Sequence, residues 1–368
     1  MAKRIEGSTP KQDGFRMPGE YEPHDKIWMI WPQRTDNWRL GGKPAQEVYT
    51  EVAKTISKFT NVTMLVNTDQ YQNARTRLPH NIRVIEMSNN DAWCRDCGPI
   101  FLVNDKGEIR ACDFRFNAWG GLYDGLYYPW DFDDMLTEKV CEIENVDIYK
   151  LEKFILEGGS IHVDGEGTVL TTEMCLLSEG RNPELTKEQI EELLCEYLNC
   201  EKVLWLKDGI DPLETNGHVD DVACFVRPGE VACIYSEDEN NPFYKVAKES
   251  YEALCEMVDA KGRKLTVHKV CTPKNKVLFE GAETIDRKLG TIPRLNGEMC
   301  NASYLNFLIT NGGVIVPQYG DENDSLALEQ LQAIFPDKEV VGVSTKEVVF
   351  GGGNIHCITM QQPKVLQK

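Results

Sequence analysis

The sequence contains no long apolar run and no low-complexity segment. Among its 368 residues, no stretch approaches the length of a signal-peptide core or a membrane span, and residues 1–10 are polar and charged. These absences argue against secretion and membrane insertion. They predict a cytoplasmic protein, and the remaining composition, 41% hydrophobic, is sufficient for a sizeable core.

Basic residues are scarce relative to acidic ones. Forty Lys and Arg residues against 59 Asp and Glu residues give a formal net charge of −19. This charge argues against nucleic acids and anionic membranes as partners, whereas it suits a small cationic substrate. Because an acidic surface also serves solubility, charge alone does not identify a function.

A disulfide pattern is also missing. The 13 cysteines are odd in number and scattered, and no secretion signal precedes them, so they are interpreted as reduced thiols. The single Cys-x-x-Cys, formed by Cys94 and Cys97, has no second pair for zinc. The residues after it have a strand-and-turn pattern instead of the helix that activates a redox thiol, so both cysteines are predicted to be packing residues.

A local pattern occurs five times along the chain. Amphipathic helical segments begin at residues 45, 130, 186, 243 and 326, and β-rich runs follow them at 62, 146, 203, 265 and 340. Thr186 and Gln189 form a capping-box pattern at the start of the third helix. Strand-turn-strand patterns follow the first four β-rich runs, at 100–112, 161–171, 218–234 and 304–316.

The repeat predicts an α/β fold, a five-bladed αβ-propeller made of αβ units. It is expected to be a single catalytic domain over residues 1–368, with 1–20 as an N-terminal arm. The fifth unit, at 355–360, lacks a return strand, and the apolar run 27–31 can supply one and close the ring. A doubly wound parallel sheet is the alternative, but no Gly-x-Gly-x-x-Gly follows the first strand and a hairpin intervenes each time.

The last unit carries the clearest chemistry. Three glycines at 351–353 precede Cys357, and their free backbone angles leave an uncrowded approach to a nucleophilic sulfur. If 355–360 is a strand, His356 and Cys357 point to opposite faces, so the base for this thiol must come from elsewhere. A buried structural cysteine is the alternative interpretation.

Three other units carry ionisable residues at the equivalent position. These are Asp96, Glu157, His218 and Asp220, whereas residues 301–304 of the fourth unit carry none. In a ring, these positions converge on one axis. If His218 and Asp220 lie on a strand, their Cα atoms are roughly 7 Å apart on one face and suit a shared planar ligand. An ordinary polar strand face is the alternative.

The motifs together resemble the agmatine deiminase family. The resemblance rests on Trp-Cys-Arg-Asp-Cys-Gly-Pro at 93–99, Glu-Gly-Gly at 157–159, Asn-Gly-His-Val-Asp at 216–220 and Gly-Gly-Gly-Asn-Ile-His-Cys at 351–357. This family is a branch of the guanidino-group-modifying, or pentein, superfamily, is similar to peptidyl-arginine deiminases and has a five-bladed αβ-propeller fold. The resemblance spans nearly the whole chain, and one departure is Cys97, where threonine is expected.

The resemblance implies hydrolysis of agmatine to N-carbamoylputrescine and ammonia. It implies that Cys357 attacks the guanidinium carbon and that His218 protonates the ammonia and later activates water. Asp96, Asp220 and Glu157 are the implied carboxylates for the guanidinium N–H groups. It also implies a homo-oligomer and no metal or organic cofactor.

The rest of the substrate pocket is less defined by sequence. Trp93 is expected to line an apolar channel around the four-carbon chain, with a core tryptophan as the alternative. Glu214, with Asp208 and Asp211 behind it, is the candidate acid for the distal amine, with a solvated loop as the alternative.

Three rival functions remain open at this stage. A deiminase of arginine or of peptidyl-arginine would use the same residues, but free arginine also requires arginine side chains at the pocket mouth for its α-carboxylate. A non-catalytic polyamine-binding protein would use the acids without Cys357. A cysteine peptidase would need an oxyanion hole, which a cluster of acidic groups opposes.

Overall fold

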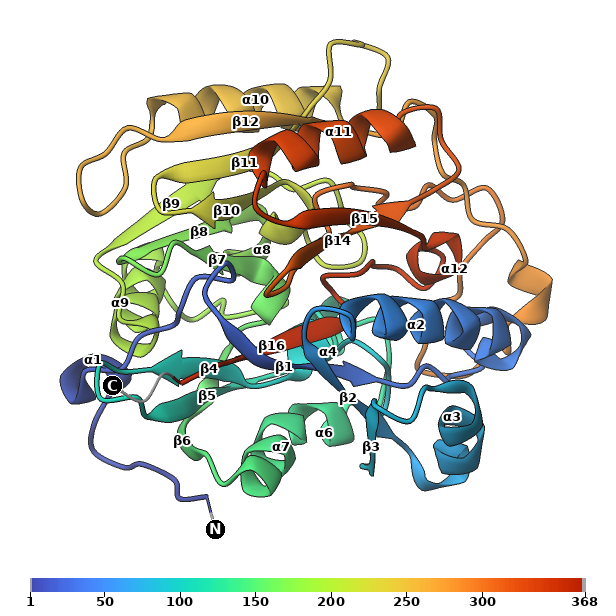
Figure 1. Cartoon of the computed structure of the whole chain (residues 1–368), viewed down its shortest axis with the longest axis horizontal. Helices are drawn as coiled ribbons and strands as arrows, with labels where there is room; N and C mark the ends of the chain where they lie inside the picture. Colours follow the sequence, from blue (N-terminus) through green and yellow to red (C-terminus); the bar gives the residue numbers. More distant parts are fainter. Residues whose placement is uncertain (1, 366–368) are drawn as a thin grey trace.

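The strands of the protein form five small sheets (Figure 1), as seen in a computed structural model that describes residues 2–365. The first sheet has the order β16-β1-β2-β3, and the others have the orders β4-β5-β6, β7-β8-β9, β10-β11-β12 and β13-β14-β15. The strands of the first two sheets are β16 (Thr359–Pro363), β1 (His24–Ile30), β2 (Asn61–Val66), β3 (Arg83–Glu86), β4 (Ile100–Val103), β5 (Ile109–Arg115) and β6 (Asp147–Ile155). Those of the other three are β7 (Ile161–Val163), β8 (Thr168–Thr172), β9 (Lys202–Leu206), β10 (Ala223–Arg227), β11 (Glu230–Tyr235), β12 (Thr266–Cys271), β13 (Leu308–Ile309), β14 (Gly313–Gln318) and β15 (Glu339–Ser344).

Every sheet contains the same unit. An antiparallel pair is followed by a parallel strand, and a helix links the two parallel strands. The linking helices are α2 (Lys43–Ile56), α7 (Leu136–Glu144), α9 (Lys187–Leu198), α10 (Tyr244–Glu256) and α11 (Asp324–Ile334). The five predicted helix-strand pairs are therefore confirmed, and five separate mixed sheets exclude one doubly wound parallel sheet.

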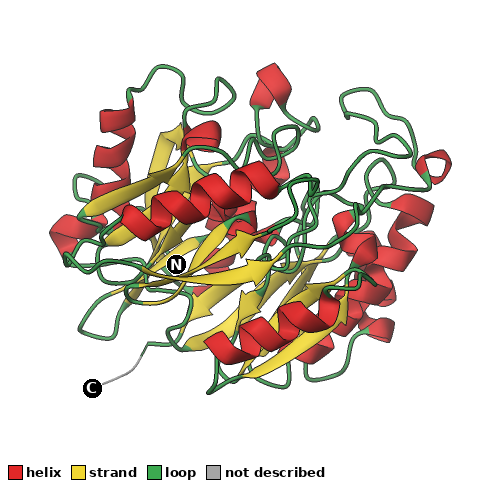
Figure 2. Cartoon of the chain, turned by 90° about the horizontal axis from the view of Figure 1, so that it is seen from above, coloured by secondary structure: helices red, strands yellow, loops and turns green. Residues whose placement is uncertain are grey.

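The local signals that define these helices act as expected. Thr186 accepts the backbone N–H of Gln189 while the Gln189 side chain accepts the N–H of Thr186, which is the predicted capping box of α9. Asn145 and Asn199 end α7 and α9 in the left-handed conformation. Figure 2 shows that the longer helices lie largely on the outer side of the strands.

The predicted pairing of the N-terminal apolar run with the last unit is confirmed. Strand β1 pairs antiparallel with β16, with Trp28 opposite Met360, and parallel with β2. The two strands come from opposite ends of the sequence and lie side by side in Figure 1. The side chain of Trp28 is completely buried, and its Nε1 donates to Gln362 Oε1 at 2.8 Å.

Some elements were not predicted. The helix α3 (Tyr71–Arg77) and strand β3 extend the first sheet beyond the repeated unit. The fourth predicted hairpin, at 304–316, is shorter than expected because β13 has only two residues. Within residues 2–365, no helix is long and apolar enough to cross a membrane.

Candidate active site

The predicted motifs meet where the antiparallel pairs of four sheets begin. Asp96 lies in the single-turn helix α4 (Cys94–Cys97) before β4, and Glu157 precedes a 3₁₀ turn before β7. His218 and Asp220 lie at the 3₁₀ turn before β10, and Cys357 lies in the turn before β16. In these four units, one or two functional side chains therefore lie at the same position, just before the first strand of the antiparallel pair.

These side chains contact one another in the interior. His218 Nδ1 is 3.8 Å from Asp96 Oδ1, and His218 Nε2 is 4.0 Å from Glu157 Oε2. Cys357 Sγ is 3.9 Å from Asp220 Oδ2. Each of the five residues is at most 4% exposed. All five residues predicted to be catalytic are thus brought together.

The Glu-Gly-Gly motif is explained by the close approach of its backbone to this cluster. A Cβ atom on Gly159 would lie 2.5 Å from His218 Nδ1 and 2.8 Å from Asp96 Oδ1. The Gly159 N–H donates to the same Asp96 oxygen at 3.0 Å, and Trp119 Nε1 donates to the other at 3.0 Å. Only glycine leaves room here, and the two donors fix the carboxylate of Asp96.

The prediction that His218 and Asp220 lie two apart on a strand is wrong. His218 begins a 3₁₀ turn, Val219–Asp221, and β10 starts only at Ala223. Their proximity results from the turn, which Asn216 and Gly217 enter with positive φ angles of 58° and 82°. Such angles favour Asn and Gly, so the Asn-Gly of the motif has a conformational role.

The predicted strand at 355–360 is also wrong in its first part. β16 begins at Thr359, and Cys357 lies in the preceding turn. The argument that excluded His356 therefore fails, because it assumed opposite faces of a strand. His356 Nδ1 is 2.7 Å from Asp220 Oδ2, the same oxygen that faces Cys357.

Asn306 is a site residue that sequence reasoning missed. It comes from the fourth unit, just before β13, and its Nδ2 lies 3.2 Å from Cys357 Sγ. Its Oδ1 accepts the backbone N–H groups of His356 at 3.0 Å and Cys357 at 3.3 Å. The equivalence of the five units was the available signal, but residues 301–304 were compared instead and carry no ionisable group.

The buried charges shift pKa values in a defined direction. Burial lowers the pKa of His218, but Asp96, the Cys175 thiol and Asp220 outweigh burial and raise it to about 10. Burial raises the pKa of Asp96 to about 6 despite His218. Burial and the nearby carboxylates, first Asp220, raise the pKa of the Cys357 thiol well above its ordinary value. Near neutral pH, His218 is therefore cationic and the thiol protonated.

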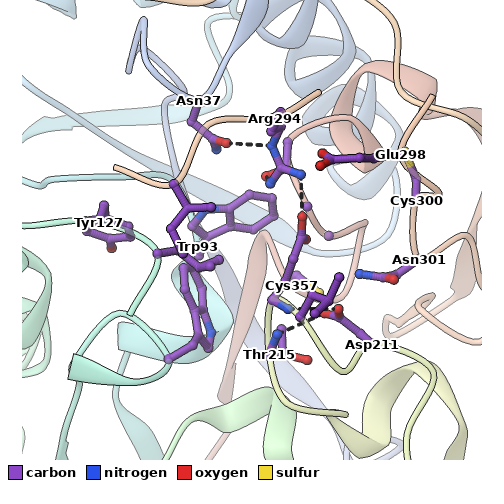
Figure 3. A pocket seen from close by; sticks show the side chains of 18 of the residues that line it. Asn37, Trp93, Tyr127, Asp211, Thr215, Arg294, Glu298, Cys300, Asn301 and Cys357 are labelled. Carbon is purple, nitrogen blue, oxygen red and sulfur yellow. Dashed lines mark hydrogen bonds and ion pairs between the residues drawn. The ribbon is translucent and has the colours of Figure 1, made fainter. Parts of the chain in front are cut away.

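A cavity of about 430 Å³ opens onto the cluster (Figure 3). Cys357, Asp96, Trp93 and Trp119 line it. Trp93 stacks on Trp38 with ring centroids 5.2 Å apart and is 4% exposed. Trp93 thus lies on the cavity wall, and its contact with a substrate stays a prediction. The size of the cavity suits a small molecule.

The outer part of the cavity contains an ion pair. Glu214 lines the cavity as predicted, but its carboxylate pairs with the Arg294 guanidinium. Arg294 Nε also donates to Asn37 Oδ1 at 3.1 Å, which Figure 3 shows as a dashed line. Asp211 supports this loop by accepting the N–H groups of Glu214 and Thr215 at 3.1 and 3.0 Å. Asp211 also lines the cavity, whereas Asp208, which was predicted to lie behind Glu214, is not among the lining residues.

The Cys-x-x-Cys pair is buried, as predicted. Cys94 and Cys97 are free thiols that are at most 5% exposed. They form the helical turn α4, although no helix was expected there. Burial raises the pKa of Cys94 to about 12 and that of Cys97 well above its ordinary value, so neither is an activated thiol.

Among residues 2–365, two groups of side chains have a spacing that could hold a metal ion. They are Glu20 with His162 and His356, and Glu157 with Cys175 and His218. Each contains a carboxylate that already faces a guanidinium: Arg95 is 3.7 Å from Glu20, and Arg181 is 2.7 Å from Glu157. A histidine that binds a metal must be neutral, whereas carboxylate neighbours outweigh burial and raise the pKa values of His356 and His218, so neither group suits a metal near neutral pH.

Comparisons with known proteins identify the family. Residues 16–363 match the family described as Porphyromonas-type peptidyl-arginine deiminase. The chain belongs to this family. The match covers the five sheets and all the clustered residues described above.

Individual members of this family are similar to the chain over its whole length. A solved agmatine deiminase of Enterococcus faecalis is 68% identical, with a TM-score of 0.98 over 99% of this chain and all of that one. A Lactococcus lactis protein, provisionally named as an agmatine deiminase, is 67% identical over 99% of this chain and all of that one. A C. jejuni agmatine deiminase, solved as a cysteine-to-serine variant with substrate bound, is 27% identical, with a TM-score of 0.81 over 96% of this chain and 97% of that one.

Proposed function

We propose that the protein is an agmatine deiminase, which hydrolyses agmatine to N-carbamoylputrescine and ammonia. The observation that carries this proposal is a buried cluster of a thiol, Cys357, a cationic His218 and three carboxylates, those of Asp96, Glu157 and Asp220. Cys357 and Asp96 of this cluster line the cavity. A guanidinium is a planar cation with several N–H donors, and carboxylates are its natural acceptors. The high similarity to agmatine deiminases supports the same substrate.

The first half of the reaction removes ammonia. Asp96, Asp220 and Glu157 hold the guanidinium in plane. The Cys357 thiol loses its proton to solvent, and the thiolate sulfur forms a bond to the central carbon, whose carbon–nitrogen π electrons move onto nitrogen. His218 transfers its proton to one terminal nitrogen, the carbon–nitrogen bond breaks, and ammonia leaves a covalent amidino-thioether on Cys357. The raised pKa of His218 supports this role, because the residue must enter the reaction protonated.

The second half of the reaction releases the product. His218, now neutral, accepts a proton from a water molecule, and the water oxygen bonds to the same carbon. The carbon–sulfur bond then breaks with its electrons on sulfur, and the added hydroxyl loses its proton as the urea carbonyl of N-carbamoylputrescine forms. The product leaves, and Cys357 takes up a proton to recover its thiol. Asn306 Nδ2, 3.2 Å from the sulfur, is placed to donate to it while the sulfur carries charge.

Substrate binding supplies the charge that activates the thiol. In the free protein, burial and the carboxylates disfavour the thiolate of Cys357. A bound guanidinium neutralises those carboxylates and lies beside the sulfur, so it lowers the thiol pKa. The nucleophile is then formed chiefly when the correct cation is present.

The cavity favours agmatine over free arginine. Its two lining arginines already have partners: Arg294 pairs with Glu214 and donates to the Gly351 carbonyl, and Arg34 pairs with Asp36. Free arginine would bring an α-carboxylate, which needs an uncommitted cation. No such cation exists among the described lining residues. Glu214 pairs with Arg294 through Oε1, but its Oε2 has no hydrogen-bond partner among residues 2–365 and can accept from the distal amine of agmatine. The same acids disfavour a peptidase.

We also infer that the five sheets close into a five-bladed αβ-propeller that forms one domain over residues 1–368. The repeated unit, the pairing of β1 with β16, and the delivery of site residues from equivalent positions support this arrangement. The homo-oligomer and the cytoplasmic location remain predictions.

The decisive test is ammonia release from agmatine and, in parallel, from free arginine, with intact-mass analysis of quenched enzyme. We expect turnover of agmatine, little turnover of arginine, and a transient adduct on Cys357 that is lost in Cys357→Ser together with all activity. Preferred turnover of arginine would keep the chemistry but overturn the substrate. Binding of agmatine without turnover or adduct would instead identify a polyamine-binding protein.

A further inference from the structure

A buried chain of charged side chains lies behind Cys357. Asp220 Oδ2 faces the thiol at 3.9 Å and His356 Nδ1 at 2.7 Å. The other ring nitrogen of His356, Nε2, lies 2.8 Å from Glu20 Oε2. Glu20, His356 and Asp220 are each at most 4% exposed. The reaction described above has no use for His356 or Glu20.

The geometry of this chain determines the protonation of His356. Both ring nitrogens face carboxylate oxygens, and only the doubly protonated imidazolium donates from both. Arg95 NH2 lies 3.7 Å from Glu20 Oε2, so two cations and two carboxylates balance one another. The neighbouring His162, whose ring lies parallel to that of His356 at 6.0 Å, is neutral because burial lowers its pKa to about 4.

The contact with His356 has two consequences for Asp220. Burial raises the pKa of Asp220, but the hydrogen bond and charge of His356, helped by His218 and Arg95, outweigh it and lower the pKa. The same contact fixes one oxygen, Oδ2. The other, Oδ1, is buried and has no hydrogen-bond partner among residues 2–365, so it is available to a guanidinium N–H.

Glu20 is itself held in place. Its Oε1 accepts the backbone N–H of Ile309 in β13 at 2.9 Å, while Oε2 faces His356. Glu20 comes from the segment before β1 and is separated from His356 by 336 positions in the sequence. The N-terminal segment thus reaches the back of the active site.

We propose that His356 is a positioning residue, which keeps Asp220 ionised and oriented for the substrate guanidinium, and that Glu20 acts through His356. This inference rests on the proposed deiminase function for its kinetic consequences. Titratable and charged groups face the chain from several elements. They are Arg95 and Asp96 from α4, His24 from β1, His162 from β7, His218 and Asp221 from the 3₁₀ turn before β10, Cys224 from β10, and Cys357.

The test compares His356→Gln, Glu20→Gln, the double variant, and Glu22→Gln as a matched control. Glu22 lies in the same segment as Glu20, but it pairs with Arg16 at 2.7 Å and is not part of the row of contacts from Glu20 through His356 to Asp220. Thermal unfolding of each variant separates a folding defect from a kinetic one. The measurements are kcat and KM for agmatine across pH, and the rate at which iodoacetamide alkylates Cys357 without substrate, followed by peptide mass.

For His356→Gln we expect a KM at least about tenfold higher, with a smaller loss of kcat, because Asp220 loses its fixed orientation and part of its charge. Without His356, the effect of burial on Asp220 is no longer outweighed, and the pKa of Asp220 should rise past that of Asp96. Asp220 would then set the acid limb of kcat/KM in place of Asp96, and the limb should move up by about one pH unit. Loss of the imidazolium should also slow alkylation of Cys357 about tenfold at a fixed pH below the thiol pKa.

Glu20→Gln should change KM, the acid limb and alkylation in the same direction but by less, because a neutral His356 still donates to Asp220. Since Glu20 acts through His356, the double variant should be no worse than His356→Gln alone. Glu22→Gln should match the wild type.

Three results would overturn the inference: an unshifted acid limb and alkylation profile in folded His356→Gln, fully additive losses in the double variant, or equal effects of Glu20→Gln and Glu22→Gln. If the wild-type protein did not turn over agmatine, the proposed function would be wrong. The role of Glu20 and His356 could still be tested, because alkylation of Cys357 needs no turnover.

Discussion

At the scale of single residues, Asp96 and His218 set the pH range of the reaction. Asp96 must be ionised to accept guanidinium N–H groups, and its pKa is raised to about 6 by burial. His218 must be protonated to act as an acid; Asp96, Cys175 and Asp220 outweigh burial and raise its pKa to about 10. Activity should therefore be lost as the pH falls through the first pKa and as it rises through the second.

We predict a bell-shaped pH dependence of kcat/KM for agmatine, with an acid limb near pH 6 and an alkaline limb near pH 10. Asp113 provides a matched control, because burial also raises its pKa to about 6, but its partner is Lys150, at 3.4 Å. Asp113→Asn should keep the acid limb, whereas Asp96→Asn should lose most activity. A rate that instead rises continuously beyond pH 9 would mean that the free enzyme must already carry the thiolate.

At the scale of elements, the glycine-rich turn before β16 shapes the approach to the thiol. A Cβ on Gly353 would lie 2.7 Å from Trp93 Cζ3 and 3.0 Å from Cys357 Sγ. For a Cβ on Gly351, the three nearest atoms would all belong to Trp38, the nearest of them at 2.2 Å. The two glycines therefore have separable roles in catalysis and in packing.

We predict that Gly353→Ala lowers kcat/KM by about 100-fold, because the added methyl group displaces the sulfur or the substrate from reacting geometry. Gly351→Ala should cost about 1–3 kcal/mol of unfolding free energy by overpacking Trp38, with a smaller loss of kcat/KM. Steady-state kinetics and denaturant unfolding of the two variants provide the comparison. Equal catalytic losses at equal stability losses would show that both glycines serve only packing.

The repeated unit was predictable because its helices and strands carry regular apolar periodicity. The turns at His218 and Cys357 could not be predicted, because one turn of irregular backbone has no periodic pattern of its own. The apolar pattern of the strand that follows each turn made the turn look like part of that strand. The short elements α3 and β3 were missed for a similar reason, because neither is long enough for a clear pattern.

The site was predictable only in part, for a related physical reason. The motif residues were identified by their resemblance to a family, and their convergence followed from the five equivalent units. Asn306 and Glu20 were missed because each acts through a contact between distant segments, such as the 2.8 Å contact between Glu20 and His356. His356 was excluded because it was wrongly placed on a strand with Cys357, whereas both lie in the turn before β16. Long-range side-chain contacts leave no mark on the local sequence.

At the scale of the whole molecule, the net charge of −19 acts on a substrate with two positive charges. A negative protein attracts such a ligand over distances comparable to the Debye length, which falls from about 30 Å to about 10 Å between about 0.01 M and about 0.1 M salt. Inside the cavity, the carboxylates of Asp96 and Glu214 also attract a positively charged ligand. The surface charge, which alone indicated no function, then contributes to capture of the substrate.

We predict that kcat/KM for agmatine falls about tenfold over this salt range, mainly through KM, because screening weakens the long-range attraction. Alkylation of Cys357 by neutral iodoacetamide is the control and should change little, since the thiol is buried and the reagent uncharged. Equal salt dependence of both reactions would mean that salt acts on the thiol or the fold. If agmatine turnover were instead independent of salt, only the buried carboxylates of the cavity would recruit the cation, and the acidic surface would serve solubility alone.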